Sequence, residues 1–216
     1  MNKINAKQIK PFLIDFLLQK EKSKYDLLVN EAPFLRGNRW ADLLAIKKDN
    51  LIGFEIKSEA DTLKKLSNQI SDYLKVFNTV YVVIFEKFKR NADLKSLSKN
   101  IGIIIVDKKM NFKVYRKAKI RSKLDKNALI SFLWKEDLEK LALNSKYKEV
   151  IKLREYVLKN YSLKQIHSKA IRVLKTRYSE TYRLFLRDRG NYTTLDDISL
   201  ITGLKKNLVS LNKSIA

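Results

Sequence analysis

Three ionisable residues interrupt two short apolar runs in the first third of the chain. Asp42 lies within RWADLLAIK (residues 39–47), and Glu55 and Lys57 lie within LIGFEIK (residues 51–57). Alternate residues of a strand share a face, so Glu55 and Lys57 should point the same way. The Lys-Asp-Asn turn between the runs favours an antiparallel hairpin, which would bring the Asp42 carboxylate near Glu55.

Such a group of charges suits the hydrolysis of phosphodiester bonds. Burying two carboxylates and a lysine is costly unless they bind something, and a divalent cation would satisfy the acids. A cation held by Asp42 and Glu55 can polarise a phosphate and lower the pKa of a bound water. Lys57 can orient that water or stabilise developing negative charge. The plain alternative is a surface Glu/Lys ion pair, which is common and weak.

Residue usage narrows the choice of metal. The chain has no cysteine and a single histidine, His167, which excludes disulfides, thiolate nucleophiles and zinc sites built on several imidazoles. A metal would have to be held by carboxylates, and this predicts Mg²⁺ or Mn²⁺. For His167 itself we expect a structural or solvated role.

The formal net charge of +23 and the pI near 10.0 indicate an anionic partner. Nucleic acid is the favoured one. A lysine-rich codon bias and an anionic membrane surface are the alternatives. The first ten residues contain no apolar signal segment, and the longest apolar runs are too short to span a bilayer. These features predict a cytoplasmic protein without membrane association.

The periodicity of the chain predicts an α/β fold followed by an all-α extension. Residues 25–36 are expected to form a loop or short strand, and 61–77 a helix with Asp61 as a plausible N-cap. Further helices are expected at 8–20, 91–99, 126–144, 147–160 and 163–188, and strands at 39–47, 51–57, 79–85, 101–106 and 112–116. The boundary is placed at residue 120, with 1–120 as the core and 121–216 as a basic helical extension.

The helix after Lys57 carries Gln69 and Tyr73 on one face. The whole layout resembles the PD-(D/E)XK nuclease superfamily, and Gln69 and Tyr73 resemble the QxxxY element of its RecB-like and VRR-NUC-like branches. The chain is also similar to the sce7726 family over residues 8–175, most closely over 39–77. The resemblance implies a restriction-endonuclease-like core, a mixed sheet flanked by helices. Ala41 stands where the superfamily name has proline.

The resemblance also implies roles for individual residues. Asp42, Glu55 and Lys57 would be catalytic, with Gln69 and Tyr73 holding the phosphate or the geometry of the site. Glu31 would join Asp42 and Glu55 as a further metal ligand or water holder. The simpler interpretations are a solvated loop carboxylate for Glu31, a solvent-facing amide for Gln69 and core packing for Tyr73.

Arginines are concentrated in the helical extension. Arginine binds phosphate in a bidentate fork, so we expect them to contact nucleic acid, with Tyr178, Tyr182 and Tyr192 as stacking groups. A solvated helix face is the alternative. The predicted nucleic-acid-binding residues are Arg39, Arg154, Arg172, Arg177, Arg183, Arg187 and Arg189.

Together these features predict a Mg²⁺-dependent (or Mn²⁺-dependent) deoxyribonuclease. Two alternatives stay open: a non-catalytic DNA-binding protein on a nuclease fold, and a nuclease directed at RNA. The residues do not distinguish endonuclease from exonuclease activity, and a homodimer is compatible with them.

Overall fold

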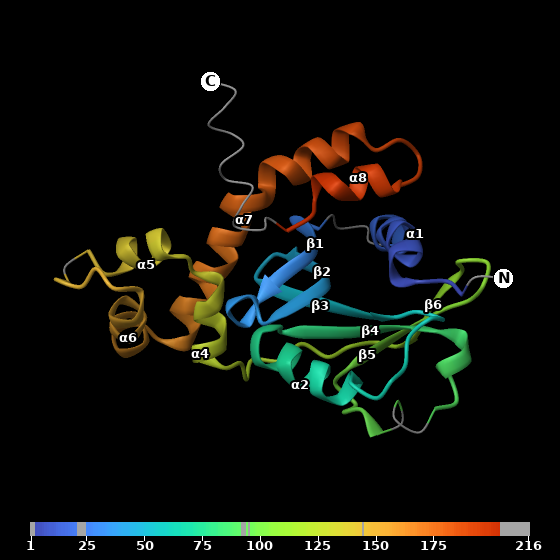
Figure 1. The fold of residues 1–216 in the computed structure, drawn as a ribbon, viewed down its shortest axis with the longest axis horizontal. Helices are drawn as coiled ribbons and strands as arrows, with labels where there is room; N and C mark the ends of the chain where they lie inside the picture. Colours follow the sequence, from blue (N-terminus) through green and yellow to red (C-terminus); the bar gives the residue numbers. More distant parts are fainter. Residues whose placement is uncertain (1–2, 21–24, 92–93, 95, 144, 204–216) are drawn as a thin grey trace.

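The protein is an α/β structure built on one six-stranded sheet (Figure 1). The computed structural model describes residues 3–20, 25–91, 94, 96–143 and 145–203. The strands are β1 (Leu27–Phe34), β2 (Arg39–Lys47), β3 (Asn50–Lys57), β4 (Thr79–Phe85), β5 (Gly102–Val106) and β6 (Phe112–Arg116). The sheet order follows the chain order, β1-β2-β3-β4-β5-β6.

The sheet is mixed. The strands β1, β2 and β3 form an antiparallel meander, β3, β4 and β5 run parallel, and β6 returns antiparallel at the edge. The central strands β4 and β5 are nearly continuous apolar runs, as expected for strands covered on both faces. The predicted α/β class and the predicted hairpin between β2 and β3 are confirmed.

Helices cover both faces of the sheet. Figure 1 shows α2 (Leu66–Val76) on one side, and α1 (Ala6–Lys20), α8 (Leu195–Leu200) and the end of α7 (Leu163–Asp188) on the other. The connection β3-α2-β4 links parallel strands through a helix. Residues 201–203 lie along β1 and bond to Asn30, so the outer edge of this strand is covered.

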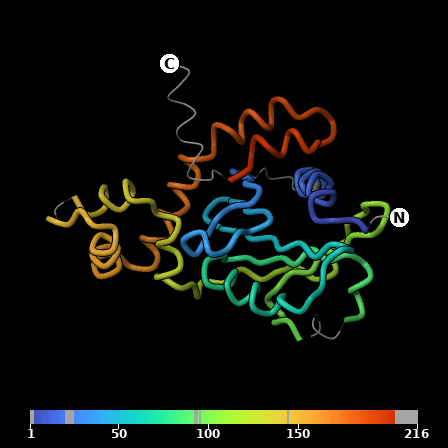
Figure 2. The backbone as a smooth tube through the Cα atoms, viewed as in Figure 1, coloured from blue at the N-terminus to red at the C-terminus, as the bar shows by residue number. Residues whose placement is uncertain are grey.

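The C-terminal region is helical, as predicted. Its other helices are α4 (Lys126–Leu129), α5 (Lys135–Leu141) and α6 (Val150–Asn160). The tube in Figure 2 shows α7 running from beside α6 toward α8. A capping box of Ser162 and Gln165 starts α7 where expected. The predicted boundary at residue 120 falls in the extended segment between β6 and α4.

Three predicted helices are wrong in their bounds, and one of them, expected over 147–160, begins at Val150. The single helix expected over 126–144 is broken by the 3₁₀ turn η3 (Ile130–Phe132) and by extended backbone at Trp134, where the Asp137 carboxylate accepts a bond from the Trp134 amide and starts α5. The helix expected from residue 61 begins at Leu66, because Asp61 instead accepts bonds from Ser58. The helix expected at 91–99, like residue 144, falls partly outside the described residues.

Candidate active site

The site forms where β2 and β3 separate. Their paired residues run from Lys47↔Asn50 to Leu43↔Phe54, one residue short of Asp42 and Glu55. Beyond this pair the Asp42 carboxylate, not its backbone, reaches across: its Oδ2 accepts a 2.8 Å hydrogen bond from the Ile56 amide. The hairpin therefore places Asp42 beside Glu55, as its turn and spacing predicted.

Tyr73 holds the two strands in this arrangement. Its hydroxyl accepts a 3.3 Å hydrogen bond from the Asp42 amide and donates a 3.3 Å bond to the Phe54 carbonyl. The ring can approach so closely because residue 53 is glycine: a Cβ there would lie 2.8 Å from Tyr73 and 2.7 Å from Phe77. Burial, with the nearby Glu55 and Asp42 charges, raises the pKa of Tyr73, so the hydroxyl keeps its proton and remains a donor.

Glu55 is the most enclosed acid of the site. Its Oε1 accepts a 2.8 Å bond from Lys57 Nζ and a 2.5 Å bond from Gln69 Nε2. The side chains of Lys57 and Glu55 are 9% and 4% exposed, so the alternative of a solvated surface ion pair is excluded. Gln69 faces the acid rather than solvent.

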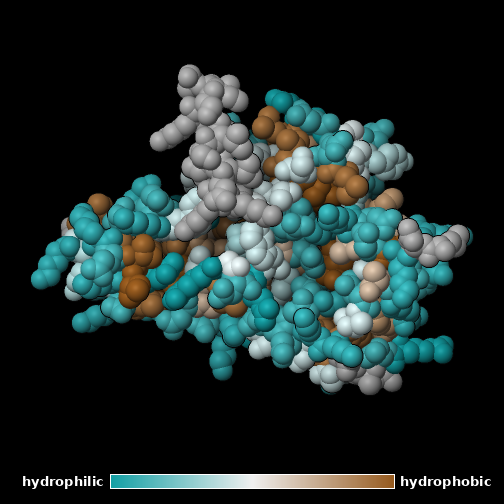
Figure 3. All heavy atoms as spheres, viewed as in Figure 1, coloured by the Kyte–Doolittle hydropathy of each residue, from teal (hydrophilic) through white to brown (hydrophobic). Residues whose placement is uncertain are grey.

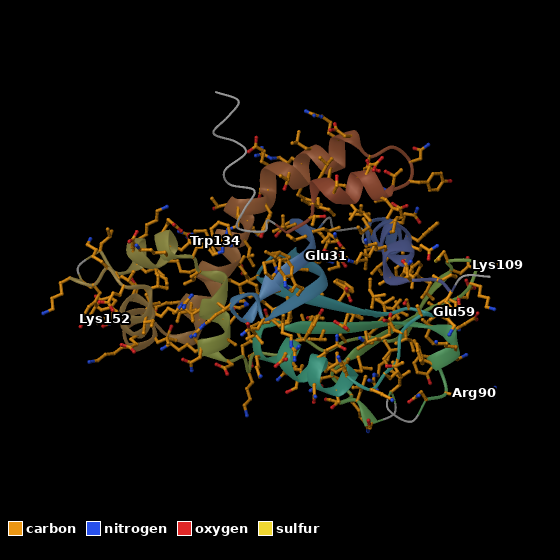
Figure 4. All side chains as sticks on the ribbon, in the orientation of Figure 1. Glu31, Glu59, Arg90, Lys109, Trp134 and Lys152 are labelled. Carbon is orange, nitrogen blue, oxygen red and sulfur yellow. The ribbon has the colours of Figure 1, made fainter. Side chains whose placement is uncertain are left out.

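Sequence reasoning missed Lys10, a buried residue of α1. Its Nζ lies 3.0 Å from Glu31 Oε1 and 4.0 Å from Asp42 Oδ1. A buried lysine needs anionic partners, and Lys10 lies between two of the acids singled out in the sequence. In the sequence, the position of Lys10 directly after the apolar Ile9 is the one hint that Lys10 is buried. Only the packing of α1 against the sheet brings Lys10 to the site. Figure 4 shows the labelled Glu31 between the sheet and α1.

The electrostatics of the site favour a cation near the two acids. Burial, and secondarily the Glu55 charge, raises the pKa of Asp42 to about 6, with Lys10 and Lys57 only partly offsetting the effect. In addition, Gln69 Oε1 is buried and has no hydrogen-bond partner. A like-charge pair and an orphaned acceptor are both satisfied by a bound cation or its water.

The fit to a metal is limited to two carboxylates. Among the described residues, no three His, Asp or Glu side chains are gathered so that they could hold one ion. The structure thus brings Asp42 and Glu55 together but leaves Glu31 paired with Lys10. Two acids still suit Mg²⁺, which keeps several waters and is commonly bound through one or two carboxylates plus substrate phosphates.

The predicted nucleic-acid-binding arginines do not form one surface. Arg177 is largely buried: it pairs with Asp137 at 3.0 Å and its guanidinium lies 3.5 Å from the centroid of the Trp134 ring. Arg189 pairs with Asp15 at 2.5 Å, and Arg39 with Asp72 at 2.6 Å. These three have structural partners. The exposed members are Arg39, Arg172, Arg183 and Arg187, the last of which pairs with Asp188 at 2.7 Å, while Arg154 is half-buried.

Two of the tyrosines proposed as stacking groups are core residues. Tyr178 and Tyr182 are buried on α7, whereas Tyr192 is exposed. His167 has a structural role: its Nε2 lies 2.7 Å from Asn78 Oδ1, which also accepts a bond from the Leu51 amide. Because Oδ1 can only accept, Nε2 carries the proton.

No helix in the described part of the chain is both long and apolar enough to cross a membrane.

Comparison with known proteins identifies relatives among phage proteins. The sequence profile of the family described as Bacteriophage P4 protein cII matches residues 1–202. Protein cII of Enterobacteria phage P4 is 29% identical over 222 aligned positions, covering 97% of this chain and 82% of that protein. Among solved structures, the SPO1766 protein of unknown function from Silicibacter pomeroyi covers 62% of this chain and 80% of its own, at 19% identity. Its TM-score of 0.34 is too low to support an argument.

Proposed function

The chain belongs to the Bacteriophage P4 protein cII family, and we propose that it is a divalent-metal-dependent nuclease of the PD-(D/E)XK type. The family description names no activity, so the proposal rests on the site. One observation carries it: Asp42 and Glu55 meet where β2 and β3 separate, with Lys57 Nζ 2.8 Å from Glu55. The proposed setting is the cytoplasm.

In the proposed reaction a phosphodiester bond of DNA is hydrolysed. Mg²⁺ or Mn²⁺ held by Asp42 and Glu55 would supply a polarised phosphate and a water of lowered pKa. Lys57, fixed beside Glu55, donates its N–H groups toward charge that develops on the phosphate oxygens, or orients the attacking water.

The remaining residues position the acids. Gln69 fixes the Glu55 carboxylate from α2, and Tyr73 fixes the Asp42 backbone. Lys10 partly neutralises Asp42 and Glu31 from the opposite layer of the fold. A site whose supporting groups are themselves packed and bonded loses little entropy when it binds substrate.

The competing proposal is a nucleic-acid-binding protein that does not cleave. The lack of a three-acid metal group among the described residues favours it. The buried Glu55–Lys57 pair favours cleavage. A buried ion pair often stabilises a fold less than well-packed apolar residues of similar volume, so a role in the reaction accounts for the pair better than stability does. An RNA-directed nuclease is the third option.

The test is a cleavage assay with linear, circular and single-stranded DNA and with RNA, each with Mg²⁺, Mn²⁺ or EDTA. Glu55→Gln and Lys57→Met preserve side-chain volume and should abolish metal-dependent cleavage. Glu86→Gln and Lys64→Met alter exposed residues and are the matched controls. Cleavage that persists in both site variants, or absence of cleavage in the wild type under all conditions, would refute the nuclease proposal. RNA cleavage alone would support the third option.

A further inference from the structure

A cleft of about 1170 Å³ lies between the sheet and the helical extension. One wall is the 3₁₀ turn η1 (Leu35–Gly37) with the start of β2, and the others come from η3, α5, α6 and α7. Trp134, labelled in Figure 4, lies beside α7 on this side of the molecule. In Figure 3 most of the visible face is hydrophilic, with hydrophobic side chains gathered over the α5–α6 end and over α7 and α8.

The cleft contains basic side chains without acidic partners. Arg36, Arg154 and Arg172 line it together with Lys140 and Lys169, and the acids Glu136 and Asp137 line it as well. No carboxylate of the described residues forms an ion pair with any of these five, although Arg177 in the same cleft pairs with Asp137. Unpaired guanidinium groups facing one cavity bind an anion, and a phosphate fits their forked geometry.

Arg36 lies near enough to Arg154 for its charge to act on the Arg154 guanidinium. The Nε of Arg154 is buried and has no hydrogen-bond partner. Burial, and then the Arg36 charge, lowers the pKa of Arg154, so each cation raises the cost of holding the other. An unsatisfied buried donor beside a like charge is destabilising unless an anion occupies the space between them.

The backbone that presents Arg36 is strained. Leu35 and Arg36 both have positive φ values, 48° and 61°, a left-handed conformation that is strained for a residue with a side chain. Gly37, at φ 83°, completes the turn. Strain of this kind is maintained at binding sites, where it aims a side chain that a relaxed turn would point elsewhere.

Trp40 connects the cleft to the proposed catalytic pair. It lines the cleft and is 41% exposed. Trp40 and Asp42 are alternate residues of β2, so they leave the strand on the same face, about 7 Å apart. The indole of Trp134 is covered by Arg177, whereas no cation of the described residues lies over the ring of Trp40, so this ring can stack on a base. A base can stack there only if it is unpaired.

We propose that this cleft binds single-stranded nucleic acid, with phosphates on Arg36 and Arg154 and a base on Trp40. The proposal rests on the proposed nuclease function in one respect only, which is that the bound nucleic acid runs from the cleft toward Asp42. It also identifies the substrate class of that function: a strand with an unpaired stretch at the site of cleavage.

The test is a binding measurement in EDTA, which requires no catalysis. Fluorescence anisotropy of labelled dT20, rU20 and a 20-base-pair duplex is measured with the wild type, Arg36→Gln/Arg154→Gln, Arg172→Gln and Trp40→Ala. Arg90→Gln/Lys109→Gln removes the same charge from two residues at the other end of the molecule (Figure 4). Circular dichroism and thermal unfolding verify that each variant is folded.

We expect the double cleft variant to bind dT20 at least about 10-fold more weakly. The slope of the logarithm of the binding constant against the logarithm of the salt concentration should fall in magnitude by about 1.4, because two phosphate contacts are lost. Trp40→Ala should weaken dT20 about 5- to 100-fold and leave duplex binding unchanged. Arg172→Gln should weaken dT20 binding less than the double cleft variant does. The control double variant should lower the affinity for dT20 by less than about threefold. Comparison of dT20 with rU20 identifies which sugar the cleft prefers.

Equal losses in the cleft and control variants, or no binding of single strands by the wild type, would overturn the cleft proposal. Glu55→Gln should bind dT20 no more weakly than the wild type does, because it removes a negative charge and no cleft contact. Cleft-dependent binding without any cleavage would therefore sustain the cleft and refute the nuclease, and cleavage with no cleft-dependent binding would do the reverse.

Discussion

Gln69 reaches from α2 to β3, and its Nε2 lies 2.5 Å from Oε1 of Glu55. The same oxygen accepts from Lys57 Nζ at 2.8 Å. Because both donors bind Oε1, the second carboxylate oxygen is the atom better placed to meet a cation. The amide of Gln69 therefore selects which oxygen of Glu55 faces the proposed metal.

Replacement of Gln69 by alanine should reduce kcat by about 10- to 100-fold, because a carboxylate that loses a positioning donor no longer holds the reactive geometry. Thermal stability should change little, since Lys57 still pairs with Glu55. Asn68→Ala, the neighbouring exposed amide on α2, is the control. Steady-state cleavage kinetics with a Mg²⁺ titration measures the effect, and unchanged kcat in Gln69→Ala would show that the bond has no role in positioning.

Asp42→Asn should abolish cleavage and yet stabilise the metal-free protein. The raised pKa of Asp42, about 6, means that its carboxylate is less stable in the folded protein than in the unfolded chain, and asparagine can still accept from the Ile56 amide. We expect a gain of about 1–2 kcal/mol, or roughly 2–8 °C in Tm for a chain of this size. Calorimetry in EDTA at pH 7.5 measures it, with Glu86→Gln as the control, and a lower Tm would contradict the electrostatic account.

The bridge between β2 and β3 can be tested at Tyr73 and Gly53. Tyr73→Phe removes the hydroxyl that satisfies the Asp42 amide and the Phe54 carbonyl, at a cost of about 1–2 kcal/mol. Gly53→Ala inserts a Cβ against the Tyr73 and Phe77 rings and should cost about 1–3 kcal/mol. Denaturant unfolding measures both. Gly190→Ala, where a Cβ meets nothing within 4 Å, is the control for the glycine.

Both variants should also lower cleavage under conditions where they remain folded, because each moves Asp42 relative to Glu55. A Tyr73→Phe protein with wild-type stability and kcat would refute the bridging role.

His167 should make stability depend on pH. Burial lowers its pKa in the folded protein, so the unfolded chain takes up a proton first, near pH 6.5. Its contribution is present above pH 6.5 and is lost as pH falls from there toward the folded-state pKa. Denaturant unfolding of wild type and His167→Gln between pH 5 and 8 measures the difference. If the wild type and the variant lose stability in parallel over that range, the buried neutral imidazole is not the cause.

The sheet was predictable because its strands are unambiguous. The apolar run of β4 and the alternation around Glu55 have no competing helical interpretation, and the bounds of 39–47, 79–85 and 112–116 agree with the structure. Helix starts were harder, because Asp61 has the residue type of an N-cap but its carboxylate is already used by Ser58. The break at 130–134 depends on Asp137 capping the Trp134 amide, a local competition that periodicity does not register.

Part of the site was predictable because it depends on the geometry of a single strand. Glu55 and Lys57 are two residues apart on one strand, so their proximity follows from local geometry. Lys10 reaches the site from a helix packed on the sheet, and Arg36 meets Arg154 only through the fold of the helical extension. Contacts between residues far apart in the chain carry no pattern within a single sequence, which is why Arg177 and Arg189 were expected to bind nucleic acid although both have acidic partners.

Metal-dependent cleavage by the wild type and by Glu55→Gln, measured side by side, tests the central claim most directly. Single-stranded and duplex DNA are incubated either with Mg²⁺ at about 5 mM or with EDTA. The binding of dT20 is measured in parallel. The account predicts cleavage by the wild type only with Mg²⁺, loss of cleavage in Glu55→Gln, and dT20 binding by that variant that is no weaker than that of the wild type. Cleavage by Glu55→Gln at the wild-type rate would contradict it.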